Sequence, residues 1–166
     1  PFANPPTSPP SSDTMAGEYD IDFRAHPEAY RVQSGEQGAF KVEPYKGELL
    51  PLWSFKTETD ARKSVAALET RYTDYREAAD FVGMDMVRKY LQMGFTRAMR
   101  YAKHPGGKKV NDDGTERAPQ QWADAEKRAA AVVFRDAWQA VREDPDYQRL
   151  KQHHIDDVYN EDVSPM

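Results

Sequence analysis

Three stretches of the sequence carry apolar residues at every third or fourth position, and this spacing constrains the fold more than any other feature. It is the period of an α-helix that buries one face. In the first stretch, residues 58–78, the apolar positions form one continuous stripe, and a threonine at position 57 or 59 can cap the amino end. The sequence therefore predicts a long helix that packs one face on a core.

The second stretch predicts a helix over residues 81–103. Asp80 is a suitable amino-terminal cap, and the His-Pro-Gly-Gly sequence at 104–107 ends the helix, because proline and glycine are typical of helix termini. One side of this helix is apolar, whereas the opposite side carries cations. We expect the apolar side to face the core.

The third stretch predicts a helix over residues 119–143, with Pro119 in its first turn. Asp-Pro at 144–145 then begins a short fourth helix that reaches about residue 154.

A β-hairpin is predicted ahead of the helices. Residues 30–32 and 39–43 alternate between apolar and polar side chains, and the Gly-Glu-Gln-Gly sequence at 35–38 supplies a turn. Pro44 then ends the second strand. The predicted fold class is α+β and mainly helical, with three longer helices, one short helix and a small hairpin packed against them.

The chain of 166 residues suits one globular domain, predicted over residues 18–154. Residues 1–17 hold five prolines among small polar residues and are predicted to be a disordered tail. Residues 155–166 are predicted to be an acidic, frayed tail. There is no cysteine, which excludes disulfides and thiolate metal sites.

No stretch of the sequence has the length and apolar character of a transmembrane helix, and the amino end does not resemble a signal peptide. We therefore expect a soluble, intracellular protein, either cytoplasmic or nuclear, that does not contact membranes. The first residue is Pro1 rather than methionine, so the sequence does not exclude a targeting segment upstream of it.

The charge is unevenly distributed. The chain carries a formal net charge of −5, yet residues 88–109 contain seven lysines and arginines and no acid. Arg97 and Arg100 can present two guanidinium groups side by side, and the Gly-Gly-Lys-Lys loop that follows adds amides and ammonium groups. The predicted anion-binding residues are Lys89, Arg97, Arg100, Lys103, Lys108 and Lys109.

Neither a P-loop nor a G-x-G-x-x-G motif is present, so no sequence motif indicates nucleotide hydrolysis. The neighbouring histidines His153 and His154, close to Asp156 and Asp157, are residue types that bind metals. Adjacent residues face different sides of a helix, however, and no metal site and no cofactor is predicted.

Three motifs stand out in the first two-thirds of the chain: Gly-Glu-Gln-Gly at 35–38, Val-Glu-Pro-Tyr-Lys at 42–46, and the stretch at 81–97 that begins Phe-Val-Gly-Met-Asp-Met. Together they resemble a domain of unknown function found in bacteria, tailed phages and fungi. The resemblance implies no activity and no catalytic residues, although occurrence in phages favours a role with nucleic acids or nucleotides. The polar residues of these motifs that would form a pocket are Glu36, Gln37, Glu43, Lys46, Asp85 and Arg88.

Three functional hypotheses stay open. The first is a binding module that engages the phosphates of DNA, RNA or a phosphorylated small molecule. The second is a small enzyme acting on a nucleotide or phosphorylated ligand, with Asp85 or Glu43 as the acid–base group. The third is a structural or protein-interaction domain whose cations are paired internally, with Glu43 bonded to Lys46 and Asp85 to Arg88. The oligomeric state is not predicted.

Overall fold

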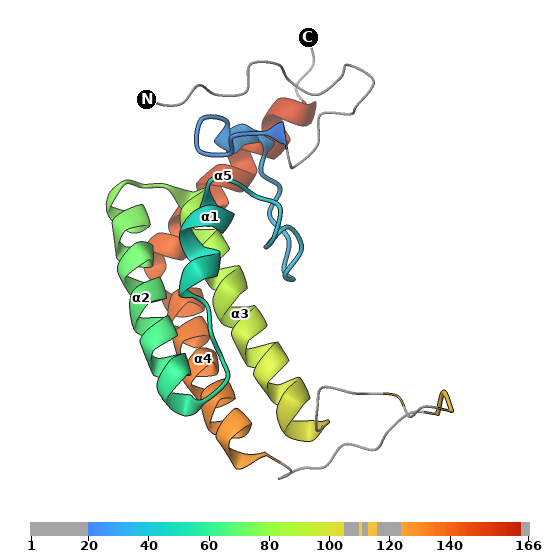
Figure 1. Ribbon diagram of the computed structural model, residues 1–166. Coiled ribbons are helices and arrows are strands. Elements are labelled where there is room, and N and C mark those ends of the chain that lie inside the picture. Colours follow the sequence, from blue (N-terminus) through green and yellow to red (C-terminus); the bar gives the residue numbers. More distant parts are fainter. Residues whose placement is uncertain (1–19, 105–109, 111–112, 116–123, 164–166) are drawn as a thin grey trace, which may run out of the picture.

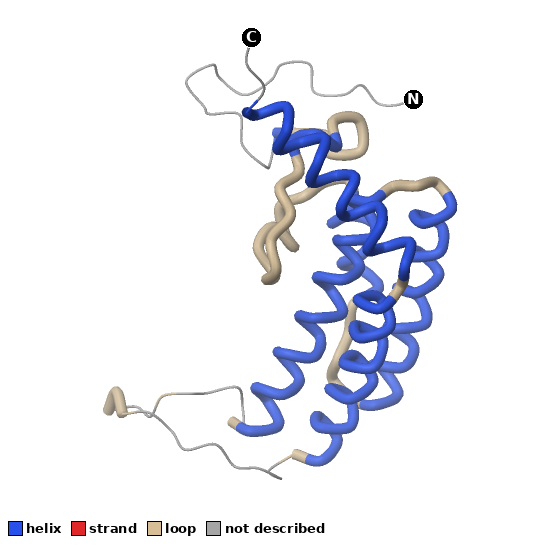
Figure 2. The backbone as a smooth tube through the Cα atoms, turned by 180° about the vertical axis from the view of Figure 1, so that it is seen from behind, coloured by secondary structure: helices blue, strands red, loops and turns tan. Residues whose placement is uncertain are grey.

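The computed structural model describes residues 20–104, 110, 113–115 and 124–163, and side chains as far as residue 158. Within these residues the chain forms five α-helices and two short 3-10 helices, and Figure 2 shows no strand. In chain order the elements are η2 (Pro27–Ala29), α1 (Tyr45–Leu49), η3 (Leu50–Leu52), α2 (Glu58–Glu77), α3 (Phe81–Lys103), α4 (Ala125–Glu143) and α5 (Pro145–Val163). The fold class is therefore all-α, and the predicted α+β class is wrong.

The long helices α2, α3 and α4 lie side by side, and α3 packs most extensively on α4 (Figure 1). From the end of α4, α5 continues past the amino-terminal part of α3. The segment before α1 lies beside α5 and the same part of α3. The amino-terminal half of α3 is thereby enclosed on every side.

The predicted helix starts at Thr57 and Asp80 are confirmed. The Thr57 hydroxyl accepts a hydrogen bond from the Asp60 amide at 3.0 Å, and the Asp80 carboxylate accepts one from the Gly83 amide at 3.1 Å. These side chains satisfy amides that have no partner in the first turn of a helix.

The carboxyl-terminal helices differ more from the prediction. The first described residue of α4 is Ala125, and residues 119–123 of the predicted helix lie outside the described part of the chain. The predicted short fourth helix is α5, which spans 19 residues and ends at Val163.

The predicted β-hairpin is absent from the described chain, and α3 supplies the physical reason. Carbonyl groups at residues 33–35 accept hydrogen bonds from Arg88, that of Gln37 accepts one from Lys89, and that of Ala39 accepts one from the Tyr90 hydroxyl. Side chains of a helix thus provide the donors that a partner strand would provide. The chain makes turns over residues 37–44, with Gly38 at a φ of 86°, and leads directly into α1.

Every residue of α3 from Phe81 to Leu91 is buried. This run includes the charged residues Asp85, Arg88 and Lys89, which are 0%, 4% and 2% exposed. The apolar face of α3 packs on the core, as periodicity predicts. Over residues 81–91 the opposite face is covered as well. Within the described residues, no helix combines the length and the apolar composition needed to cross a membrane.

Candidate functional site

A buried polar cluster surrounds the carboxylate of Asp85. Tyr30 donates to Oδ2 and Tyr147 donates to Oδ1 at 2.6 Å. Arg88 donates to both oxygens, from Nε at 2.9 Å and from its terminal nitrogen Nη2 at 3.0 Å. Burial alone would raise the pKa of Asp85, but the charge of Arg88 and these hydrogen bonds outweigh it and hold the pKa below its usual value.

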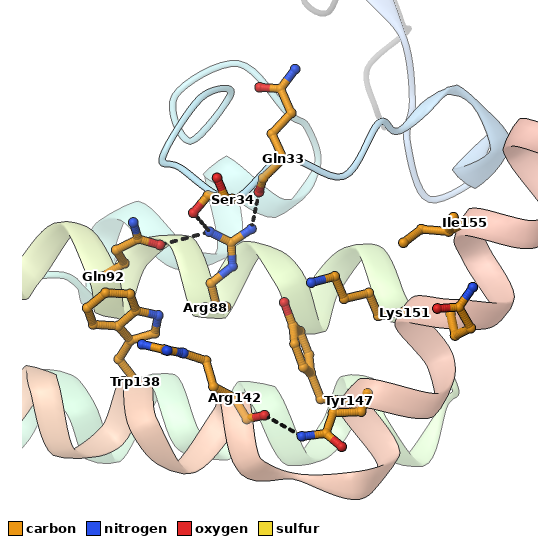
Figure 3. Close-up of a pocket in the computed structure, with 11 residues that line it drawn as sticks. Gln33, Ser34, Arg88, Gln92, Trp138, Arg142, Tyr147, Lys151 and Ile155 are labelled. Carbon is orange, nitrogen blue, oxygen red and sulfur yellow. Dashed lines mark hydrogen bonds between the residues drawn. The ribbon is translucent and has the colours of Figure 1, made fainter.

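The remaining donors of Arg88 are also occupied. Its terminal nitrogens donate to the carbonyl groups of Gln33, Ser34 and Gly35 at 2.7 to 3.2 Å, and to the side-chain oxygen of Gln92 at 2.8 Å (Figure 3). Arg88 therefore ties the 33–35 segment to α3 and has no N–H group left for a ligand. The pairing of Asp85 with Arg88 that the third hypothesis requires is present.

The six residues predicted to form a pocket do not converge. Glu36 accepts a hydrogen bond from the hydroxyl of Thr96 at 2.8 Å. Glu43 accepts one from the Gly47 amide at 2.9 Å, and the described residues show no ion pair between Glu43 and Lys46. Of the six, only Arg88 lines the cavity between α3, α4 and α5, and Gln37 lines a separate, smaller one.

The cavity lined by Arg88, of about 690 Å³, lies between the 33–34 segment and helices α3, α4 and α5 (Figure 3). Its lining contains three cations and several amides but no carboxylate. The lining residues are Gln33, Ser34, Arg88, Gln92, Trp138, Arg142, Tyr147, Gln148, Lys151, Gln152 and Ile155. We call it the α3–α5 pocket.

Two cations of the α3–α5 pocket are available to a ligand. The guanidinium of Arg142 lies 4.9 Å from the centre of the Trp138 ring, and Lys151 extends from α5 towards Arg88 and Tyr147 (Figure 3). Within the described chain, neither cation makes an ion pair or a side-chain hydrogen bond. The indole N–H of Trp138 is buried and has no acceptor there. Unused donors thus gather at one wall of the pocket.

The predicted anion-binding residues do not share one environment. Lys89 is buried, donates to the carbonyl of Gln37 and lies 4.8 Å from the centre of the Tyr30 ring. Arg97 lies over two aromatic rings, while Arg100 and Lys103 are exposed. Lys89 therefore lies inside the protein, apart from the exposed cations of α3. The predicted residues Lys108 and Lys109 lie outside the described residues.

No sequence pattern singles out the cations of the α3–α5 pocket. Arg142 and Lys151 occur in helices that carry charges of both signs, so no run of like charge marks them. Trp138 falls on the predicted buried face of its helix, which is the usual place for a core residue. The one available signal is the polar indole N–H at a buried position, since such a group normally has a partner.

The α3–α5 pocket lies within the part of the chain that matches a protein-family model. No curated protein and no solved structure is significantly similar to the chain. A family model described as "Domain of unknown function (DUF4385)" matches residues 13–157, which include all the residues that line the α3–α5 pocket. The resemblance in the motifs is thus confirmed at the level of the family, and the chain belongs to the DUF4385 family of domains of unknown function.

Proposed function

We propose that the protein binds a phosphate-bearing small molecule in the α3–α5 pocket. The observation that carries this proposal is the group of unused donors formed by Arg142, Lys151 and the indole N–H of Trp138. Guanidinium and ammonium groups are the side chains that bind phosphate oxygens in proteins. No carboxylate of the lining competes for them.

The energetics favour an anionic ligand. A buried donor without an acceptor costs about 1–3 kcal/mol, so a ligand oxygen that accepts from the Trp138 N–H would offset that cost. Arg142 and Lys151 both bring positive charge to the lining, so each attracts a negative charge placed in the pocket. An anion therefore stabilises three groups of the pocket at once.

The volume of the α3–α5 pocket suits an organic ligand better than an inorganic ion. A cavity of 690 Å³ lies within the range of about 300–1,000 Å³ that is typical of small-molecule sites. The amides of Gln92, Gln148 and Gln152 also line it and can bond hydroxyl or carbonyl groups of an organic ligand. An organic phosphate ester uses both the cations and the amides.

Binding is better supported than catalysis. The acceptor positions of Asp85 are occupied by Tyr30, Tyr147 and Arg88, and Asp85 does not line the pocket. Glu43 does not line it either. An acid–base mechanism would need a carboxylate or another titrating group in contact with the ligand.

Thermal unfolding in the presence of phosphate compounds tests the proposal. We expect adenosine monophosphate or a sugar phosphate at saturating concentration to raise the unfolding midpoint by roughly 5 °C. Inorganic phosphate should have a smaller effect, because it does not reach the amides. The double variant Arg142→Gln/Lys151→Gln should bind at least about tenfold more weakly, measured by calorimetric titration.

The matched control is Arg135→Gln/Arg149→Gln, which removes two exposed cations from the same helices. These cations do not line the pocket, so the control should bind as the wild type does. The proposal is wrong if no phosphate compound shifts the midpoint, or if the control loses affinity as much as the pocket variant.

A further inference from the structure

A second surface combines aromatic rings from three parts of the chain. Phe40, Trp53, Phe55 and Tyr101 are in successive ring contact, with centroid distances of 6.2, 5.1 and 6.0 Å. Phe40 precedes α1, the next two residues lie between η3 and α2, and Tyr101 lies near the end of α3. Phe40 is 36% exposed and the other three are half-buried. We call this row of rings the aromatic strip.

Two cations lie on the aromatic strip. The guanidinium of Arg97 is 5.9 Å from the ring centre of Phe40 and 5.8 Å from that of Trp53. At the other end, the ammonium of Lys127 is 5.5 Å from Phe55 and 5.6 Å from Tyr101. Among the described residues, neither side chain forms an ion pair or a hydrogen bond. Ring faces attract both charges, and no acid of the described chain forms an ion pair with either.

This arrangement has the two components of a surface for nucleic-acid strands. Cations bind the phosphates of the backbone, while aromatic rings stack on bases, and the combination is typical of proteins that bind single strands without sequence preference. A guanidinium that rests on a ring is held in place with its N–H edge free for a phosphate oxygen. Arg97 has that position on Phe40 and Trp53.

We propose that the aromatic strip, with Arg97 and Lys127, binds single-stranded nucleic acid. An unpaired strand is the partner that uses both components, because the bases of a duplex are stacked on each other and cannot reach Phe40. A lipid surface fits less well, since three of the four rings are half-buried and cannot insert into a bilayer. Because the chain as a whole carries a net charge of −5, the attraction depends on local cations, and binding is strongest at low salt.

The salt dependence of oligonucleotide binding provides the test. Fluorescence anisotropy of a labelled oligothymidylate of about twelve nucleotides should show binding that weakens steeply between about 50 and 200 mM salt. Each phosphate contact with a single strand contributes about 0.7 to the slope of log affinity against log salt. We therefore expect Arg97→Gln/Lys127→Gln to lower that slope by about 1.4.

The double variant Arg135→Gln/Arg149→Gln changes the net charge by the same amount and should keep the wild-type slope. Equal loss in both double variants would show that only overall charge matters and would overturn the proposal. So would the absence of any binding at about 50 mM salt.

Phe40→Leu separates stacking from charge. Leucine keeps an apolar side chain at this exposed position but removes the ring, so affinity should fall about tenfold while the salt slope stays unchanged. An unchanged thermal unfolding midpoint would show that the fold persists. Tighter binding of a duplex of the same length, or of vesicles of phosphatidylcholine and phosphatidylserine, would contradict the proposal.

The aromatic strip and the α3–α5 pocket share no residue, and their tests are independent. Arg142→Gln/Lys151→Gln should bind the oligonucleotide as the wild type does. A pocket that binds no phosphate compound would leave this expectation intact, and an oligonucleotide that fails to bind would leave the pocket untouched.

Discussion

Arg88 and Lys89 are neighbouring cations that the fold buries in different ways. Arg88 distributes its N–H groups between the Asp85 carboxylate, three backbone carbonyls and Gln92. Lys89 donates to the carbonyl of Gln37 and lies against the Tyr30 ring. Buried charges are tolerated when paired or hydrogen-bonded. Both residues therefore stabilise the segment before α1 rather than offering charge to a ligand.

Replacing Asp85 with Asn tests this role at a single residue. The substitution keeps the shape of the side chain but leaves the charge of Arg88 buried and uncompensated. We expect the free energy of unfolding, measured by urea denaturation, to fall by about 3–5 kcal/mol. Asp136→Asn, which removes an exposed partner of Arg135, should change it by less than about 1 kcal/mol. A similarly small effect at Asp85 would contradict the structural role.

The indole N–H of Trp138 is a single polar atom that distinguishes the α3–α5 pocket from ordinary core packing. Its ring packs 5.9 Å from that of Phe95, as expected for the buried face of α4, yet its N–H has no acceptor among the described residues. Periodicity predicts that the ring lies on the core-facing side of α4, because spacing alone defines a helix face. It cannot predict the unpaired N–H, which depends on the atoms that surround the ring.

Between elements, the close approach of α3 and α4 depends on Gly94. A Cβ atom at this position would lie 2.3 Å from the ring of Phe134, which is fully buried. Glycine therefore lets the aromatic ring pack directly on the backbone of α3. Periodicity identifies both faces, but it does not reveal that this glycine is required for packing.

Gly94→Ala should destabilise the contact between these helices. Overpacking of a core costs about 1–3 kcal/mol, and the better helix propensity of alanine returns up to about 1 kcal/mol. We expect a lower thermal unfolding midpoint and partial recovery in Gly94→Ala/Phe134→Leu. Gly47→Ala is the matched control, because its nearest neighbour is the carboxylate end of Glu43 at 3.3 Å. Equal midpoints for the wild type and Gly94→Ala would disprove the packing argument.

The segment before α1 is the element for which the sequence-based prediction was wrong. Its alternating pattern favours strands, and Gly38 suits a turn, so local preferences point to a hairpin. The donors for its carbonyl groups come instead from Arg88, Lys89 and Tyr90, about fifty residues further along the chain. Local propensity is a weak guide where distant side chains supply the hydrogen bonds.

Among the described residues, three carboxyl groups with a lowered pKa connect separate elements through tyrosines and arginines. Glu48 of α1 bonds to Arg24 and Tyr75, and Asp144 at the junction of α4 and α5 bonds to Tyr72 and Arg76. Asp85 makes the third connection. The hydrogen bond and charge of Arg24 lower the pKa of Glu48, and the bonds of Asp144 outweigh its burial and lower its pKa.

These depressed pKa values predict the pH dependence of stability. A carboxyl group with a lower pKa in the folded state adds stability above its unfolded pKa, and this stability is lost as pH falls through the folded value. With unfolded values near 4, the unfolding midpoint should be nearly constant from about pH 8 to 5 and should fall steeply below about pH 4. Asp85→Asn should show a shallower fall. A midpoint that rises on acidification would contradict the assignment.

The sequence by itself determined which segments become the long helices, where α2 and α3 begin, and which of their faces are apolar. These features follow from contacts between residues at most four positions apart, which a linear pattern contains. The sequence also indicated the pairing of Asp85 with Arg88 as one alternative, since the two residues lie one turn apart on a helix.

Only the tertiary structure decided the path of the segment before α1 and the composition of the α3–α5 pocket. The unused donors of that pocket come from α4 and α5, while its opposite wall comes from α3 and the 33–34 segment. Burial of Lys89 likewise depends on a segment about fifty residues away. Packing brings these groups together, and the spacing of residues within one helix contains no information about what covers it.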